Sequence, residues 1–122
     1  MKITKVAYTI LTVLTLAIIS NSIMIGHITE NLKDEIESID QSDIESALPK
    51  YRKSLKNFEK AEKYISLTVS HDDLTNIEES YAELIGAAIA MDDTGVQKAK
   101  SRLVDALEHL GRLSGINIDS IL

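Results

Sequence analysis

The chain begins with a long apolar stretch that decides what the rest of it can fold into. After Lys2 and Lys5, residues 6–26 carry no formally charged side chain. At the helical rise of about 1.5 Å per residue this stretch is about 32 Å long, close to the ~30 Å hydrocarbon core of a bilayer. The rest of the 122 residues is polar, charged and patterned like helices. The sequence therefore predicts one transmembrane anchor that carries one small domain.

The charges on either side of this stretch predict its orientation. Lysines precede it, and the first charged residue that follows is Glu30. Because positively charged flanks stay in the cytoplasm, we expect a cytoplasmic tail (residues 1–5), a single-pass transmembrane anchor (residues 6–26) and an extracytoplasmic domain. A cleaved signal peptide is the alternative, although its apolar region is normally shorter and no A-x-A-like site follows here. Either interpretation takes the domain out of the cytoplasm.

Small and hydroxylated residues form a rough stripe on one side of the anchor, at Thr12, Thr15, Ser22 and Gly26. Such residues let transmembrane helices approach closely, so the stripe is a candidate self-association site. The alternative is that the hydroxyls bond back to carbonyl groups of their own helix.

Composition favours an all-α domain and excludes disulfides, thiolate metal sites and a cysteine nucleophile. The chain has no cysteine, one proline (Pro49), five glycines and few aromatic residues, whereas an all-β domain needs frequent turn residues. The net charge of −6 and the few aromatic residues argue against a nucleic-acid partner.

Apolar residues then recur at helical spacing in four series. The first continues the anchor as a juxtamembrane helical stalk (residues 27–41), and the other three predict a small antiparallel up-down-up bundle (residues 42–122). The four series are Ile28, Leu32, Ile36 and Ile39; Ile44, Leu48, Tyr51, Leu55, Phe58, Ile65 and Val69; Leu74, Ile77, Tyr81, Leu84, Ala88 and Met91; Val96, Ala99, Leu103, Ala106, Leu110 and Leu113.

Capping residues separate these series. Residues 40–43 supply side chains that can cap the second helix, Ser70 with Asp73 can cap the third, and Thr94 with Gln97 can cap the fourth. Residues 92–95 are expected to form the last turn between helices.

Three further features concern the ends of the helices. Pro49 either kinks the second helix or marks a start nearer Ser46. Gly115 is the expected C-terminal cap of the last helix. The apolar residues 116–122 either fold back onto the bundle or form an exposed docking peptide.

Charge is distributed unevenly between two of the predicted helices. Residues 72–93 are acidic and contain no lysine or arginine, whereas residues 50–63 are basic. If these helices pack antiparallel, their opposite charges help to set the register. The sharper interpretation is an interaction face. Either the basic helix faces anionic lipid or wall polymer, or the acidic helix faces a cationic partner. The residues of the candidate basic face are Lys50, Lys53, Lys56, Lys60 and Lys63.

No catalytic, cofactor or metal site is predicted. His71-Asp72-Asp73 resembles part of a metal site, but short polar residues at a helix start are more simply explained as a cap. Asp105 and His109 share a helix face without a third ligand nearby. Because no nucleophile or phosphate-binding motif occurs, we expect no enzyme.

The layout resembles a family of short bacterial membrane-anchored proteins, mainly from Firmicutes, known as domain of unknown function family 4363. The resemblance rests on the anchor, the run from His71 to Glu78 and the ending from Asn117 to Leu122. It implies a helical extracytoplasmic domain and no established activity.

These features predict a non-enzymatic, membrane-tethered module that binds or regulates another envelope protein. The alternative is a self-associating structural stalk of the cell envelope, a homo-oligomer. A lesser alternative is a small-ligand sensor that acts through a partner.

Overall fold

The part of the chain that the structure describes consists of helices joined by short turns. The computed structural model describes the backbone of residues 2–66 and 69–121, and the side chains of the same ranges up to residue 112. These ranges contain no strand and four helices, which are α1 (Lys2–Ser38), α2 (Ile44–Ile65), α3 (His71–Ile89) and α4 (Asp93–Ile121). The expected all-α class, with one long apolar N-terminal helix, is confirmed.

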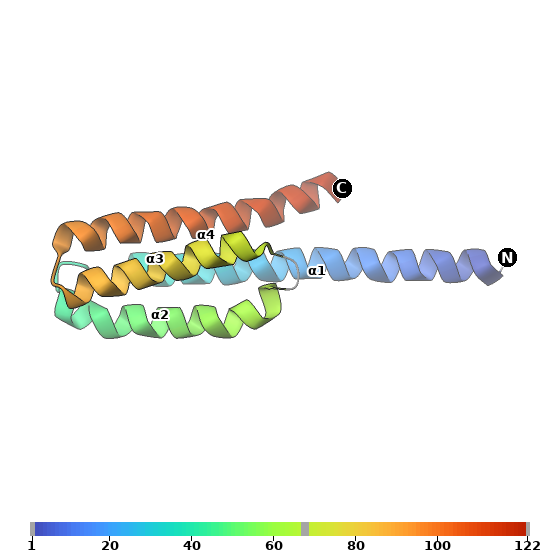
Figure 1. The fold of residues 1–122 in the computed structure, drawn as a ribbon. Helices are drawn as coiled ribbons and strands as arrows, with labels where there is room; N and C mark the ends of the chain where they lie inside the picture. The colour runs from blue at the N-terminus through green and yellow to red at the C-terminus, as the bar shows by residue number, and fades with distance from the viewer. Residues whose placement is uncertain (1, 67–68, 122) are drawn as a thin grey trace.

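The four helices form an antiparallel bundle in which neighbours in sequence are neighbours in space. The second half of α1 packs between α2 and α4, and α3 closes the bundle on the opposite side (Figure 1). The first half of α1 projects beyond the bundle by itself. Residues 27–41 were expected as a stalk beside a three-helix bundle, but residues 27–38 are a packed helix of a four-helix bundle, and residues 39–41 begin the turn to α2. Leu32, Ile36 and Ile39 are all buried there.

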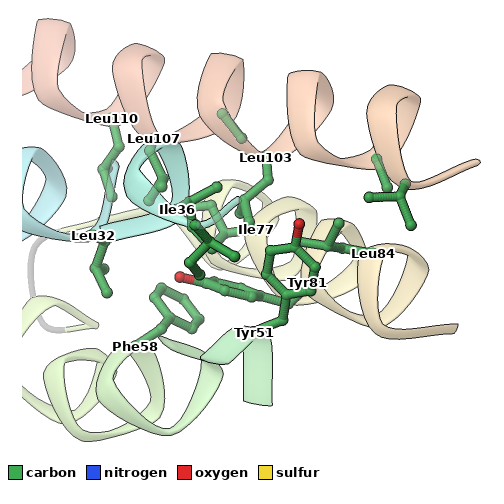
Figure 2. Close-up of a cluster of buried hydrophobic side chains, with 14 of the residues drawn as sticks. Leu32, Ile36, Tyr51, Phe58, Ile77, Tyr81, Leu84, Leu103, Leu107 and Leu110 are labelled. Carbon is green, nitrogen blue, oxygen red and sulfur yellow. The ribbon is translucent and has the colours of Figure 1, made fainter. Parts of the chain in front are cut away.

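The core contains the apolar series that the sequence predicts, with contributions from every helix (Figure 2). Tyr51 and Phe58 of α2 and Tyr81 of α3 are its largest members. The rings of Phe58 and Tyr81 stack with centroids 5.8 Å apart. Met91 is the exception, because it lies exposed in a turn. Leu113 lies outside the described side chains.

The start of α2 agrees with the predicted cap and decides the position of Pro49. The side chain of Asp43 accepts a hydrogen bond from the backbone N–H of Ser46, so α2 begins at Ile44. Pro49 therefore lies inside the helix, and the alternative start near Ser46 is wrong.

The turn between α3 and α4 differs from the prediction. Met91 adopts a left-handed conformation (φ 55°), and the N–H of Asp92 bonds to the carbonyl of Ala87, which closes a Schellman-type end to α3. Asp92 Oδ1 then accepts from the N–H of Gly95 at 3.1 Å. The cap of α4 is thus Asp92, and Thr94 lies inside the helix.

The end of α4 also differs from the prediction. Gly115 was the expected cap, but the helix continues to Ile121. Whether residues 116–122 fold back through their side chains lies outside the described residues.

Candidate functional surfaces

The first half of α1 is an exposed apolar helix. Large hydrophobic side chains point outward on every side of it, and they are Ile3, Val6, Tyr8, Ile10, Leu11, Val13, Leu14, Leu16, Ile18, Ile23 and Met24. The helix is long and apolar enough to cross a membrane. An exposed apolar surface of this extent is unfavourable in water and favourable in lipid.

The stripe of small residues on α1 is not a single free contact face. The hydroxyls of Thr12 and Thr15 donate to the carbonyls of Tyr8 and Leu11, each at 2.8 Å, as the alternative interpretation predicts. Ser22 is buried, and Gly26 is half-buried where α4 lies alongside. The half of this small-residue stripe that lies nearer the bundle, Ser22 and Gly26, is therefore packed against other parts of the same chain.

The outward face of α2 carries a row of cations. Lys53, Lys56, Lys60 and Lys63 follow one another at spacings of three and four residues, and each is exposed. Among the described side chains, none of them forms an ion pair. We call these four residues the basic stripe. The fifth predicted residue, Lys50, is also exposed, but its charge acts on Asp40, whose pKa is lowered mainly by hydrogen bonds from Ser42.

Among the described side chains, the acidic residues of α3 form no ion pair with the basic stripe, so the expected charge match between α2 and α3 stays a prediction. Arg102 of α4 instead contacts Glu83 and lies 3.4 Å from Glu79. Glu62 of α2 meets Glu78 of α3, and the hydrogen bond between these two carboxyls, together with burial and repulsion, raises the pKa of Glu62 to about 7. The four lysines of the basic stripe therefore form no ion pair with an acidic residue in the described part of the bundle.

A shallow cavity of about 340 Å³ lies at the outer end of the basic stripe. Leu48 and Pro49 give it an apolar wall, and its charged lining consists of Arg52, Lys53 and Lys56 together with one acidic residue, Glu45. Arg52 could be found from the sequence because it belongs to the basic segment 50–63. Pro49 could not, because it lines the cavity only as a result of its position inside α2.

The polar clusters considered from the sequence lie at the start of α3 and between α3 and α4. Ser70 Oγ accepts from the N–H of Asp73 at 3.2 Å, so the His71-Asp72-Asp73 run begins a capped helix. His109 Nε2 lies 3.8 Å from Asp73 Oδ1, across from α4 to α3. Within the described residues, no three His, Asp or Glu side chains converge as a metal site would require.

Comparisons with known proteins found no match among protein-family models, curated proteins or solved structures. The resemblance to domain of unknown function family 4363 therefore stays a prediction.

Proposed function

We propose that this protein is a non-enzymatic, membrane-tethered module whose bundle binds another protein of the cell envelope. In this proposal α1 crosses the membrane once with its N-terminus in the cytoplasm, and the bundle lies outside. The observation that carries the proposal is the unpaired basic stripe on α2.

The stripe is not needed to hold the bundle together. The inner face of α2 is buried through Ala47, Tyr51 and Phe58, whereas the lysines lie on the opposite side of the helix and contact no acid. A concentrated positive field on a chain of net charge −6 attracts acidic partners and excludes basic ones. This supports recognition of a partner rather than a role in folding.

The cavity beside Leu48 and Pro49 could hold a side chain of a partner that binds the basic stripe. An acidic helix lying along α2 would place carboxylates against Lys53 and Lys56 and an apolar side chain against Leu48 and Pro49. Contacts of this mixed kind are typical of protein partners, because an apolar anchor supplies affinity and the charges supply orientation.

The alternative, a self-associating stalk, has less support. Residues 27–41 bury their apolar face inside the bundle, and the hydroxyls of Thr12 and Thr15 bond to their own helix. Neither feature leaves an unused seam for a second copy.

The test is cross-linking of the full-length tagged protein in native membranes, followed by mass spectrometry of co-purifying proteins. The variant K53E/K56E reverses two charges beside the cavity. The control K98E/R112E makes the same change in net charge at two exposed cations of α4. We expect one stoichiometric partner whose recovery falls at least tenfold with K53E/K56E and is unchanged in the control. Recovery of the protein alone, or equal recovery from both variants, would contradict the proposal.

A further inference from the structure

The membrane-facing end of α2 lies close to the level at which the apolar stretch of α1 ends. Asn57 Nδ2 donates to Glu35 Oε2 at 3.1 Å, which fixes the two antiparallel helices side by side. From Asn57 to Tyr64, α2 advances about 10 Å toward the membrane, and from Glu35 back to Gly26, α1 covers about 14 Å. Lys63 and Tyr64 therefore lie within about one helical turn (5.4 Å) of the level of Gly26.

An independent contact shows that no stalk separates the bundle from this level. A Cβ atom at Gly111 of α4 would lie 3.1 Å from Thr29 Oγ1, so these two residues are side by side. The backbone of α4 continues from Gly111 to Ile121, about 15 Å further toward the N-terminus of α1. The helix therefore passes the level of Gly26, and the bundle is seated directly on the membrane if α1 crosses it.

The side chains at this end of α2 suit a lipid interface. Tyr64 is 64% exposed although it is aromatic, and it lies one helical turn after Lys60 on the outward side of α2. Tyrosine is enriched at the headgroup level because its ring is apolar and its hydroxyl is polar. Lysine side chains reach along the surface and place their ammonium groups among phosphates.

We propose that Lys60, Lys63 and Tyr64 bind the anionic phospholipid headgroups of the bilayer that α1 crosses. The inference rests on the membrane anchoring in the proposed function. Lys53 lies about 10 Å from Lys60 along α2, on the side away from the membrane, and this distance exceeds the ~8 Å screening length of physiological salt. Lys53 and Lys56, the other two residues of the basic stripe, therefore stay available to a protein. Asp72 at the start of α3 is exposed at the same end of the bundle, and its charge directs the contact to the α2 side.

The test uses tryptophan fluorescence, because the chain contains no tryptophan. Three single variants of the full-length protein are reconstituted in vesicles that contain brominated lipids, which quench tryptophan on contact. Y64W probes the proposed site. Y8W probes the apolar half of α1, where Tyr8 is 66% exposed, and I89W probes the far end of α3, where Ile89 is 58% exposed.

We expect strong quenching of Y8W, none of I89W, and quenching of Y64W that is at least twofold greater in phosphatidylglycerol vesicles than in phosphatidylcholine vesicles. Adding K60Q/K63Q to Y64W should remove this dependence on anionic lipid, whereas adding K53Q/K56Q should preserve it. Far-UV circular dichroism confirms that each variant remains folded.

The outcomes separate the inference from the anchoring. If Y8W is quenched and Y64W behaves like I89W, the headgroup contact is overturned and the anchor stands. Equal quenching of Y64W in both kinds of vesicle would overturn the role of anionic lipid. An unquenched Y8W would overturn the anchoring, and with it this inference.

Discussion

The two halves of α1 belong to one unbroken helix but meet different surroundings. Up to about residue 20, apolar side chains are exposed on all sides of the helix, and threonine hydroxyls bond back to their own carbonyls. From Ser22 onward, one side of the helix is buried against the rest of the bundle. The comparison shows that the change from uniform to one-sided hydrophobicity marks where the exposed apolar part of α1 becomes a bundle helix.

The largest expected difference between the halves is in the stability of the bundle. Ile36 is fully buried, so I36A should lower the free energy of unfolding by about 3 kcal/mol through lost contacts and a cavity. L14A removes a similar side chain from the exposed half and should change that free energy by less than about 0.5 kcal/mol. Denaturant unfolding of the full-length protein in micelles measures both. Equal effects would contradict the division of α1.

The converse change affects the membrane and leaves the bundle intact. L14R places a charge near the middle of the apolar half, where insertion costs about 2.5–3.5 kcal/mol. We expect the protein to shift from the membrane fraction to the alkali-soluble fraction, with the helix content of the bundle retained. E30R, a charge change in the exposed part of the bundle half, is the control and should stay in the membrane. Full retention of L14R would argue against a spanning helix.

The hydroxyl groups of two buried tyrosines should contribute differently to the stability of the bundle. Tyr81 Oη lies 2.8 Å from Ser54 Oγ in the core, so Y81F leaves a buried hydroxyl without its partner and should cost about 1–2 kcal/mol. The hydroxyl of Tyr51 has no hydrogen-bond partner among the described residues, so Y51F should be neutral or slightly stabilising. Thermal unfolding of both variants tests this. A larger loss for Y51F than for Y81F would show that the roles are reversed.

The smallest effect concerns the facing carboxyls of α2 and α3. The pKa of Glu62 is raised from 4.5 to about 7, so the folded state binds more protons than the unfolded state between these values. The stability of the bundle should therefore fall as pH rises from about 4.5 to 7. E62Q keeps a hydrogen-bonding group without the charge and should be about 1 kcal/mol more stable than the native chain at pH 8, and equal at pH 4.

Denaturant titration at the two pH values measures this difference. D34N, which removes an exposed carboxylate of α1, should show no comparable pH dependence. A constant offset between E62Q and the native chain at both pH values would contradict the assigned cause.

The sequence predicted what depends on local geometry. Helical periodicity identified the buried positions, such as Tyr51, Tyr81 and Leu103, because a helix that is buried on one side has apolar residues at spacings of three and four. The cap at Asp43 was also predictable, because its side chain bonds to an amide three residues away.

Features that depend on how helices meet could not be predicted in this way. Residues 27–41 had the right apolar pattern, but only the fold shows that α2 and α4 cover it. Arg102 forms ion pairs with Glu79 and Glu83 because α4, and not α2, lies beside the face of α3 that carries these two residues. The prediction of a helix end at Gly115 was wrong because a glycine can also lie inside a helix that continues. The basic stripe itself was visible in sequence, but its lack of partners was not.

The division of α1 into an exposed apolar half, which we propose to lie in lipid, and a bundle half can be measured directly along the helix. The chain has no cysteine, so single cysteines from residue 8 to residue 36 can each carry a spin label in the full-length protein in bilayers. The accessibility of each label to oxygen and to a water-soluble nickel reagent would then be recorded. We predict high oxygen access on every side up to about residue 20, followed by an oscillation of period ~3.6 with minima at Ile25, Thr29, Leu32 and Ile36. High access to the nickel reagent at residues 10–16, or one unchanged pattern along the whole helix, would contradict it.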